Sequence, residues 1–79
     1  MDTFELIKTI RTQLGMTQEA FAAAIHVAFS TVNRWENNRT KPTGMAWVVI
    51  SDYCEKHGVD KELIDAIQKI REGGIGDNE

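Results

Sequence analysis

The stretch TQEAFAAAIHVAFSTVNRWENNRTKP, residues 17–42, predicts two short helices joined by a tight turn. Thr17 offers a hydroxyl that can cap the first helix, which runs from about Gln18 onward through an alanine-rich segment. Only a short connection then precedes a second helix. In that helix Val32 and Trp35 share one face, whereas the opposite face is polar. The stretch therefore predicts a pair of helices at a fixed angle, the second with an apolar inner face and a polar outer face.

Helices are also predicted on both sides of this pair. Upstream, apolar residues recur at helical spacing over residues 4–14, and Gly15 can end that helix in a left-handed turn. Downstream, the run at residues 38–42 favours a loop because asparagine suits turns and proline disfavours helical angles in the residue before it. A threonine-capped helix follows over about residues 43–57, and another covers about residues 61–71.

The composition fits one small globular domain. The chain has 79 residues, of which 42% are hydrophobic and 27% charged, values that are ordinary for a folded protein. It is too short for a separate catalytic or effector domain. Since no alternating run suggests a strand, we predict an all-α, compact five-helix domain over residues 1–72. Its core motif lies at residues 17–37, and residues 73–79 are expected to form a flexible tail.

The net charge of −3 gives little guidance about nucleic acid until it is resolved along the chain. Residues 28–51 carry three basic side chains, Arg34, Arg39 and Lys41, against one acidic side chain. Residues 52–79 carry four basic and eight acidic side chains. Attraction to phosphate acts only within about a Debye length, roughly 8–10 Å in ordinary salt. A locally basic surface with acidic residues elsewhere can therefore still bind DNA.

The paired helices and the residues within them resemble the lambda-repressor and Cro-like family of helix-turn-helix proteins. In such a pair the second helix can enter the major groove while the first lies across the DNA backbone. The resemblance covers about residues 7–59. Gln18 matches the family position that usually binds a phosphate, and Ala22 matches the small residue at the helix crossing. Arg11 and Glu36 match a pair that often forms a buried salt bridge and would belong to the scaffold. The internal apolar positions of the family match Ile25, Val32 and Trp35.

The resemblance implies a set of DNA contacts that base chemistry supports. Arg34 can pair with N7 and O6 of guanine, Asn33 can pair with adenine, and Phe29 can touch a thymine methyl. The positions implied to face base edges are Phe29, Ser30, Asn33 and Arg34. The positions implied to contact the DNA backbone are Gln18, Asn37, Arg39, Thr40 and Lys41.

Two positions depart from the family pattern. His26 stands where glycine is usual, and histidine tolerates positive φ less well than glycine. Ala28 stands where a serine or threonine cap is usual, and alanine cannot accept the capping hydrogen bond, a loss of about 1 kcal/mol. Ser30 is the alternative cap, which would start the helix later. Phe29 then has two possible roles, contact with DNA or packing under the turn.

The fourth predicted helix is apolar on nearly all sides at residues 45–50. Val49 and Ile50 suit the core, whereas Trp47 or Val48 is left for another surface. The fifth helix adds a broad apolar stripe made of Leu63, Ile64, Ile67 and Ile70. A well-filled core and a homodimer through helices four and five both explain these stripes.

The sequence therefore predicts a repressor-like transcriptional regulator that binds double-stranded DNA, as a homodimer, and not an enzyme. No nucleophile with a base and no phosphate-binding loop is visible in it. The alternative is an antitoxin or other interaction module that binds a partner protein such as a toxin, with DNA binding for autoregulation. The apolar residues of helices four and five and the acidic C-terminal segment suit such a partner.

The remaining features of the chain predict neither a cofactor nor a membrane segment. Cys54 is the only cysteine, which excludes an internal disulfide and fits a reducing cytoplasm. With His57 it offers two of the four ligands of a structural zinc site, so no metal is expected. No stretch approaches the roughly 18 apolar residues that span a bilayer, and the N-terminus lacks the features of a signal peptide. We expect a cytoplasmic protein.

Overall fold

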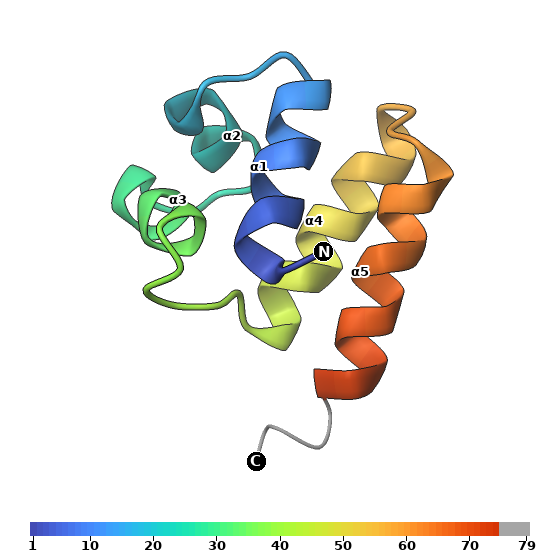
Figure 1. The fold of residues 1–79 in the computed structure, drawn as a ribbon. Helices are drawn as coiled ribbons and strands as arrows, with labels where there is room; N and C mark the ends of the chain where they lie inside the picture. Colours follow the sequence, from blue (N-terminus) through green and yellow to red (C-terminus); the bar gives the residue numbers. More distant parts are fainter. Residues whose placement is uncertain (75–79) are drawn as a thin grey trace.

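Helix α1 (Thr3–Gln13) lies between two pairs of helices (Figure 1). The computed structural model describes residues 1–74. Helices α2 (Gln18–Ala24) and α3 (Phe29–Glu36) form one pair, and helices α4 (Gly44–Lys56) and α5 (Lys61–Gly74) form the other. Helix α1 contacts both α3 and α5. Throughout the described part of the chain there is no strand, so the prediction of an all-α five-helix domain is confirmed.

Helix α5 continues to Gly74, beyond residue 71 where the sequence predicted its end. A glycine lowers helix propensity by about 1 kcal/mol relative to alanine but does not forbid helical angles. The first two residues of the predicted tail, Gly73 and Gly74, thus belong to α5. The rest of that tail, residues 75–79, lies outside the described residues.

The core is built from one face of every helix. Trp35 is 4% exposed, in agreement with its predicted place in the core. Trp47 is also 4% exposed, because it shares one face of α4 with Ile50 and Cys54 at helical spacing. The sequence analysis expected Trp47 or Val48 to be left for another surface. Trp47 is not, whereas Val48 is 44% exposed. The other core residues include Leu6, Ile7, Ile10, Phe21, Ala22, Ile25, Val32, Val59, Leu63 and Ile67.

Helices α1 to α4 end in the same backbone arrangement. A residue with positive φ follows each helix end: Gly15 at 71°, His26 at 64°, Asn38 at 59° and Gly58 at 71°. The next N–H along the chain then donates to the carbonyl five residues earlier, at 2.9–3.1 Å in all four cases. His26 therefore adopts the left-handed angles expected from its place in the turn. The two positions that are not glycine, His26 and Asn38, bracket α3.

Threonine hydroxyls cap two helices as predicted. Thr17 and Thr43 each accept a hydrogen bond from the backbone N–H three residues on, at 3.0 and 3.2 Å. Helix α3 lacks such a cap, because Ala28 precedes it, yet it begins at Phe29. The alternative start capped by Ser30 is thus wrong. Burial of the apolar face of α3 fixes the helix in place without a side-chain cap.

A single amide joins the end of α1 to the start of α5. Nε2 of Gln13 donates to Oδ2 of Asp60 at 3.0 Å, and Oε1 of Gln13 accepts from the backbone N of Asp60 at 2.7 Å. Asp60 directly precedes α5. Gln13 therefore connects the α4 and α5 pair to the helix that also supports α3.

Candidate nucleic-acid interface

The outer side of α3 carries the side chains predicted to contact bases. Phe29, in the first turn, is 48% exposed, so the alternative in which it packs under the turn is wrong. Ser30 and Arg34 are exposed as well, whereas Asn33 is half-buried. The four residues place an aromatic ring, a hydroxyl, an amide and a guanidinium on one short helix. A groove that admits an α-helix, such as the major groove of B-DNA, would meet all four chemistries together.

Basic and polar side chains continue from α3 into the following loop. Asn37, Arg39, Thr40 and Lys41 are all exposed, and Pro42 is buried at the end of the loop. Between residues 1 and 74, no carboxylate forms a salt bridge with Arg34, Arg39 or Lys41. These three charges therefore form no ion pair with a described acidic residue, and all of them fall within residues 34–41.

Glu36, the last residue of α3, is held by Arg11 of α1. Nε of Arg11 donates to Oε2 of Glu36 at 2.7 Å, and Nη2 donates to Oε1 at 3.0 Å. The third nitrogen, Nη1, donates to the carbonyl of Met16 at 2.9 Å, in the connection between α1 and α2. The structure thus brings together the predicted pair, and Arg11 joins α1 to the connection before α2 and to the end of α3.

The ion pair lies in a largely desolvated place, with the side chains of Arg11 and Glu36 16% and 4% exposed. Burial on its own would raise the pKa of Glu36. The hydrogen bonds from Arg11 and Gln18, together with the charges of Arg11 and Lys8, outweigh burial and hold the pKa of Glu36 below its usual value. The hydrogen bond to Glu36 raises the pKa of Arg11 despite its desolvation. Both groups are therefore charged near neutral pH.

Three amide side chains extend this pair toward the outer face of α3. Nε2 of Gln18 donates to Oε1 of Glu36 at 3.0 Å, and Nδ2 of Asn33 donates to Oε1 of Gln18 at 3.1 Å. Nδ2 of Asn37 then donates to Oδ1 of Asn33 at 3.1 Å and to the Asn33 carbonyl at 2.9 Å. The sequence treated Gln18, Asn33 and Asn37 as separate DNA contacts and missed that they contact one another. The four-residue spacing of Asn33 and Asn37 was the visible signal, because such residues are neighbours on a helix.

The hydrogen bonds within the protein leave donors and acceptors free on the amides of Gln18 and Asn33. An amide group has two N–H donors and an oxygen with two lone pairs. Gln18 and Asn33 each use one N–H and one oxygen lone pair in hydrogen bonds within the protein. Each keeps one further donor and one further acceptor for an external partner.

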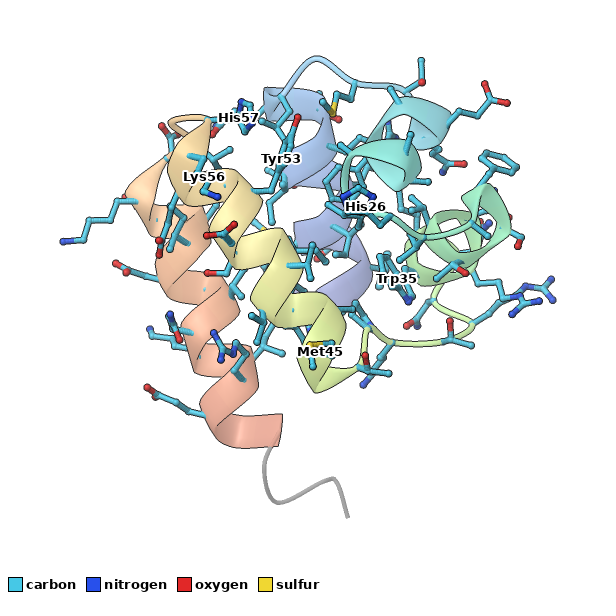
Figure 2. The ribbon with its side chains drawn as sticks, turned by 180° about the vertical axis from the view of Figure 1, so that it is seen from behind. His26, Trp35, Met45, Tyr53, Lys56 and His57 are labelled. Atoms are coloured by element: carbon cyan, nitrogen blue, oxygen red, sulfur yellow. The ribbon has the colours of Figure 1, made fainter. Side chains whose placement is uncertain are left out.

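Cys54 lies on α4 and His57 directly follows that helix. Burial, and then the charge of Glu55, raise the pKa of the Cys54 thiol to about 11. His57 stacks on Tyr53, with ring centroids 4.0 Å apart (Figure 2). Across residues 1–74, no three His, Cys, Asp or Glu side chains are grouped as a metal site would need. No helix in that range is long and apolar enough to cross a membrane.

The helix pair, its short turn and the exposed face of α3 define a helix-turn-helix protein. The family model described as Helix-turn-helix matches residues 7–60, which is more than half of the chain. The protein therefore belongs to the lambda-repressor-like helix-turn-helix family of DNA-binding regulators. A search of curated proteins and a search of solved structures found no match to this chain.

Proposed function

We propose that this protein is a sequence-specific, repressor-like regulator that inserts α3 into the major groove of double-stranded DNA. The observation that carries the proposal is the exposed face of α3, where Phe29 and Arg34 project beside a basic loop. Arg34 would pair with N7 and O6 of guanine, and Phe29 would touch a thymine methyl. Asn33 would pair with adenine, and Ser30 would contact either kind of base.

The loop after α3 would supply the contacts that do not depend on sequence. Arg39 and Lys41 would each neutralise a phosphate, and Thr40 would donate to a phosphate oxygen. Asn37 would do the same by exchanging one of its two hydrogen bonds to Asn33 for one to phosphate. On the other side of the groove, the spare N–H of Gln18 at the start of α2 would meet the opposite backbone. Repression would be steric, because occupied DNA excludes other proteins.

A second copy of the chain would complete the regulator. Met45 and Val48, one helical turn apart on α4, are 73% and 44% exposed. Figure 2 shows Met45 at the start of α4, at the end of the helix opposite His57. Two copies joined through α4 and α5 would contact half-sites about one DNA turn apart, roughly 10 bp or a multiple.

The same exposed residues support a second candidate function, an antitoxin-like module. Met45 and Val48 would then bind a partner protein such as a toxin, and the excess of acidic side chains over residues 52–79, eight against four basic, would favour a basic partner. DNA binding would serve autoregulation in that case. The two candidates differ in what covers α4.

Selection of bound DNA from a random pool, with binding measured over a range of salt, tests the main proposal. We expect a defined sequence in two related halves, and an affinity that falls steeply with salt. Equal recovery of all sequences would contradict sequence-specific binding. Light scattering on the wild-type protein and on Val48→Glu tests the dimer: the variant should be monomeric. A wild-type monomer that co-purifies with a small basic protein would favour the antitoxin-like candidate.

A further inference from the structure

We propose that Gln18 and Glu36 act as positioning residues that determine which base Asn33 accepts, by fixing the orientation of the Asn33 amide. The inference rests on the proposed function, since it concerns the same face of α3. It assigns a role in specificity to two side chains that need not touch a base.

The hydrogen bonds from Asn37 to Glu36 all run in one direction. A carboxylate can only accept, so Glu36 receives Nε2 of Gln18 and leaves Oε1 of Gln18 facing Asn33. Asn33 must then turn its Nδ2 toward Gln18, which leaves its Oδ1 to accept from Asn37. Arg11 holds Glu36 through two bonds and keeps it charged. The charge at Glu36 thereby decides the orientation of each amide in turn.

The orientation of Asn33 matters because purines differ at their major-groove edge. Adenine presents one acceptor, N7, and one donor, the N6 amino group, whereas guanine presents two acceptors, N7 and O6. A fixed Asn33 amide holds its spare N–H donor and its spare acceptor lone pair at set positions. The donor complements N7 of adenine, and the lone pair complements the N6 amino group. Opposite guanine, the same amide would place Oδ1 of Asn33 next to O6 of the base. This contact is unfavourable because both atoms are hydrogen-bond acceptors. An amide free to turn could offer its NH2 to guanine instead and would discriminate less.

The position of Gln18 suits this role. It is the first residue of α2, it is half-buried, and it bridges Glu36 to Asn33 with bonds of 3.0 and 3.1 Å.

Selection from a random pool with a set of variants, followed by competition binding, tests the inference. Asn33→Ala identifies the base position that Asn33 contacts. Gln18→Met keeps the length of the side chain but removes both hydrogen bonds. We expect it to reduce the preference for adenine over guanine at that position by about tenfold, with preferences elsewhere unchanged. The double variant that carries Gln18→Met and Asn33→Ala should show the same base preference at that position as Asn33→Ala alone. Gln68→Met, an exposed change of the same kind on α5, is the matched control.

The Gln18→Lys variant separates positioning from phosphate binding. An ammonium group at position 18 can still donate to Glu36 and to a phosphate, but it cannot accept from Asn33. We expect the affinity for DNA in general to be retained and the preference for adenine to be reduced. If Gln18→Met lowered binding equally on all sequences, Gln18 would be a phosphate ligand only and the inference would be wrong. If the wild-type protein selected no sequence at all, the proposed function itself would fail.

A measurement without DNA covers the case in which Gln18→Met folds poorly. In the wild-type protein, one side-chain N–H signal of Asn33 should be shifted downfield in an NMR spectrum by its hydrogen bond to Gln18. That shift should persist in Gln68→Met and be lost in Gln18→Lys, where the side chain at position 18 has no acceptor. A wild-type Asn33 whose two N–H signals both lie where those of a solvent-exposed amide lie would overturn the inference.

Discussion

Arg11 and Glu36, 25 residues apart in the chain, are joined by hydrogen bonds of 2.7 and 3.0 Å that tie α1 to the end of α3. The angle at which α3 leaves the protein thus depends on a helix that does not itself belong to the helix-turn-helix pair. Loss of either partner would leave the other desolvated without compensation.

Replacing Glu36 with glutamine should lower the free energy of unfolding by about 2 kcal/mol, since hydrogen bonds to a charged group are lost from a largely buried place. Urea unfolding at pH 7 measures the change. Glu55→Gln, an exposed change of the same kind, should stay within about 0.5 kcal/mol of the wild type. Equal effects of the two substitutions would show that the pair does not stabilise the fold.

The contribution of Glu36 to stability should depend on pH. Its pKa in the folded protein lies below the ordinary value of about 4.3 that it regains on unfolding. The stabilisation is therefore fully present above that ordinary value and is lost as pH falls through the lower, folded pKa. Unfolding of the wild type and of Glu36→Gln between pH 7 and pH 2 should show a difference that shrinks below about pH 4. A constant difference over this range would contradict the expectation.

Replacing His26 with glycine should raise the free energy of unfolding by about 1 kcal/mol, because a side chain at φ 64° is strained and glycine is not. Thermal unfolding followed by circular dichroism measures the gain. His57→Gly is the control, since φ there is −111° and glycine relieves no strain. A rise in stability for both variants would show that the backbone angle is not the cause.

Arg34→Ala and Lys41→Ala should weaken DNA binding in different ways. The first should lower affinity and relax the preference at one base position, at a cost of about 1–3 kcal/mol. The second should weaken binding to every sequence and reduce the slope of affinity against salt by about one. Competition binding with single-base variants of the selected site separates the two outcomes. Uniform loss for Arg34→Ala would remove it from the base contacts.

Cys54 should not react with thiol reagents in the folded protein at pH 8, because it is buried and its pKa is about 11. A disulfide-exchange reagent should report no free thiol under native conditions and one thiol in concentrated urea. Rapid reaction of the native protein would indicate that α4 opens readily.

The fold was largely predictable because its signals are local. Apolar spacing identified the helices, and Thr17 and Thr43 marked two helix starts where the structure has them. Trp47 was less predictable, since every residue around it is apolar and only the packing of α4 selects which face is buried. The start of α3 followed burial and not capping, so Ala28 was misleading.

The sequence could propose the positions of the candidate site but not the hydrogen bonds that join them. Residue types placed Gln18, Asn33 and Asn37 at helix surfaces, where each alone suits DNA. That Gln18 reaches Glu36 and Asn33 depends on the crossing angle of α2 and α3, and no local pattern gives this angle. The hydrogen bonds between Gln13 and Asp60, 47 residues apart, were not predictable either, because they depend on how α1 packs beside the start of α5.

The three basic side chains between residues 34 and 41 belong to α3 and the loop after it, whereas residues 52–72, in α4, α5 and their connection, carry six acidic against four basic side chains. The α4 and α5 pair lies on the opposite side of α1 from α3 (Figure 1). The molecule is therefore an electric dipole, whose negative end the field of a DNA duplex repels while it attracts the positive end. As the protein approaches DNA, the repulsion at one end and the attraction at the other would together rotate it, so that α3 faces the duplex before any contact forms. With a net charge of −3, encounters in other orientations would be short-lived. The overall negative charge of the chain would thus select the encounters in which α3 faces the DNA, rather than oppose binding.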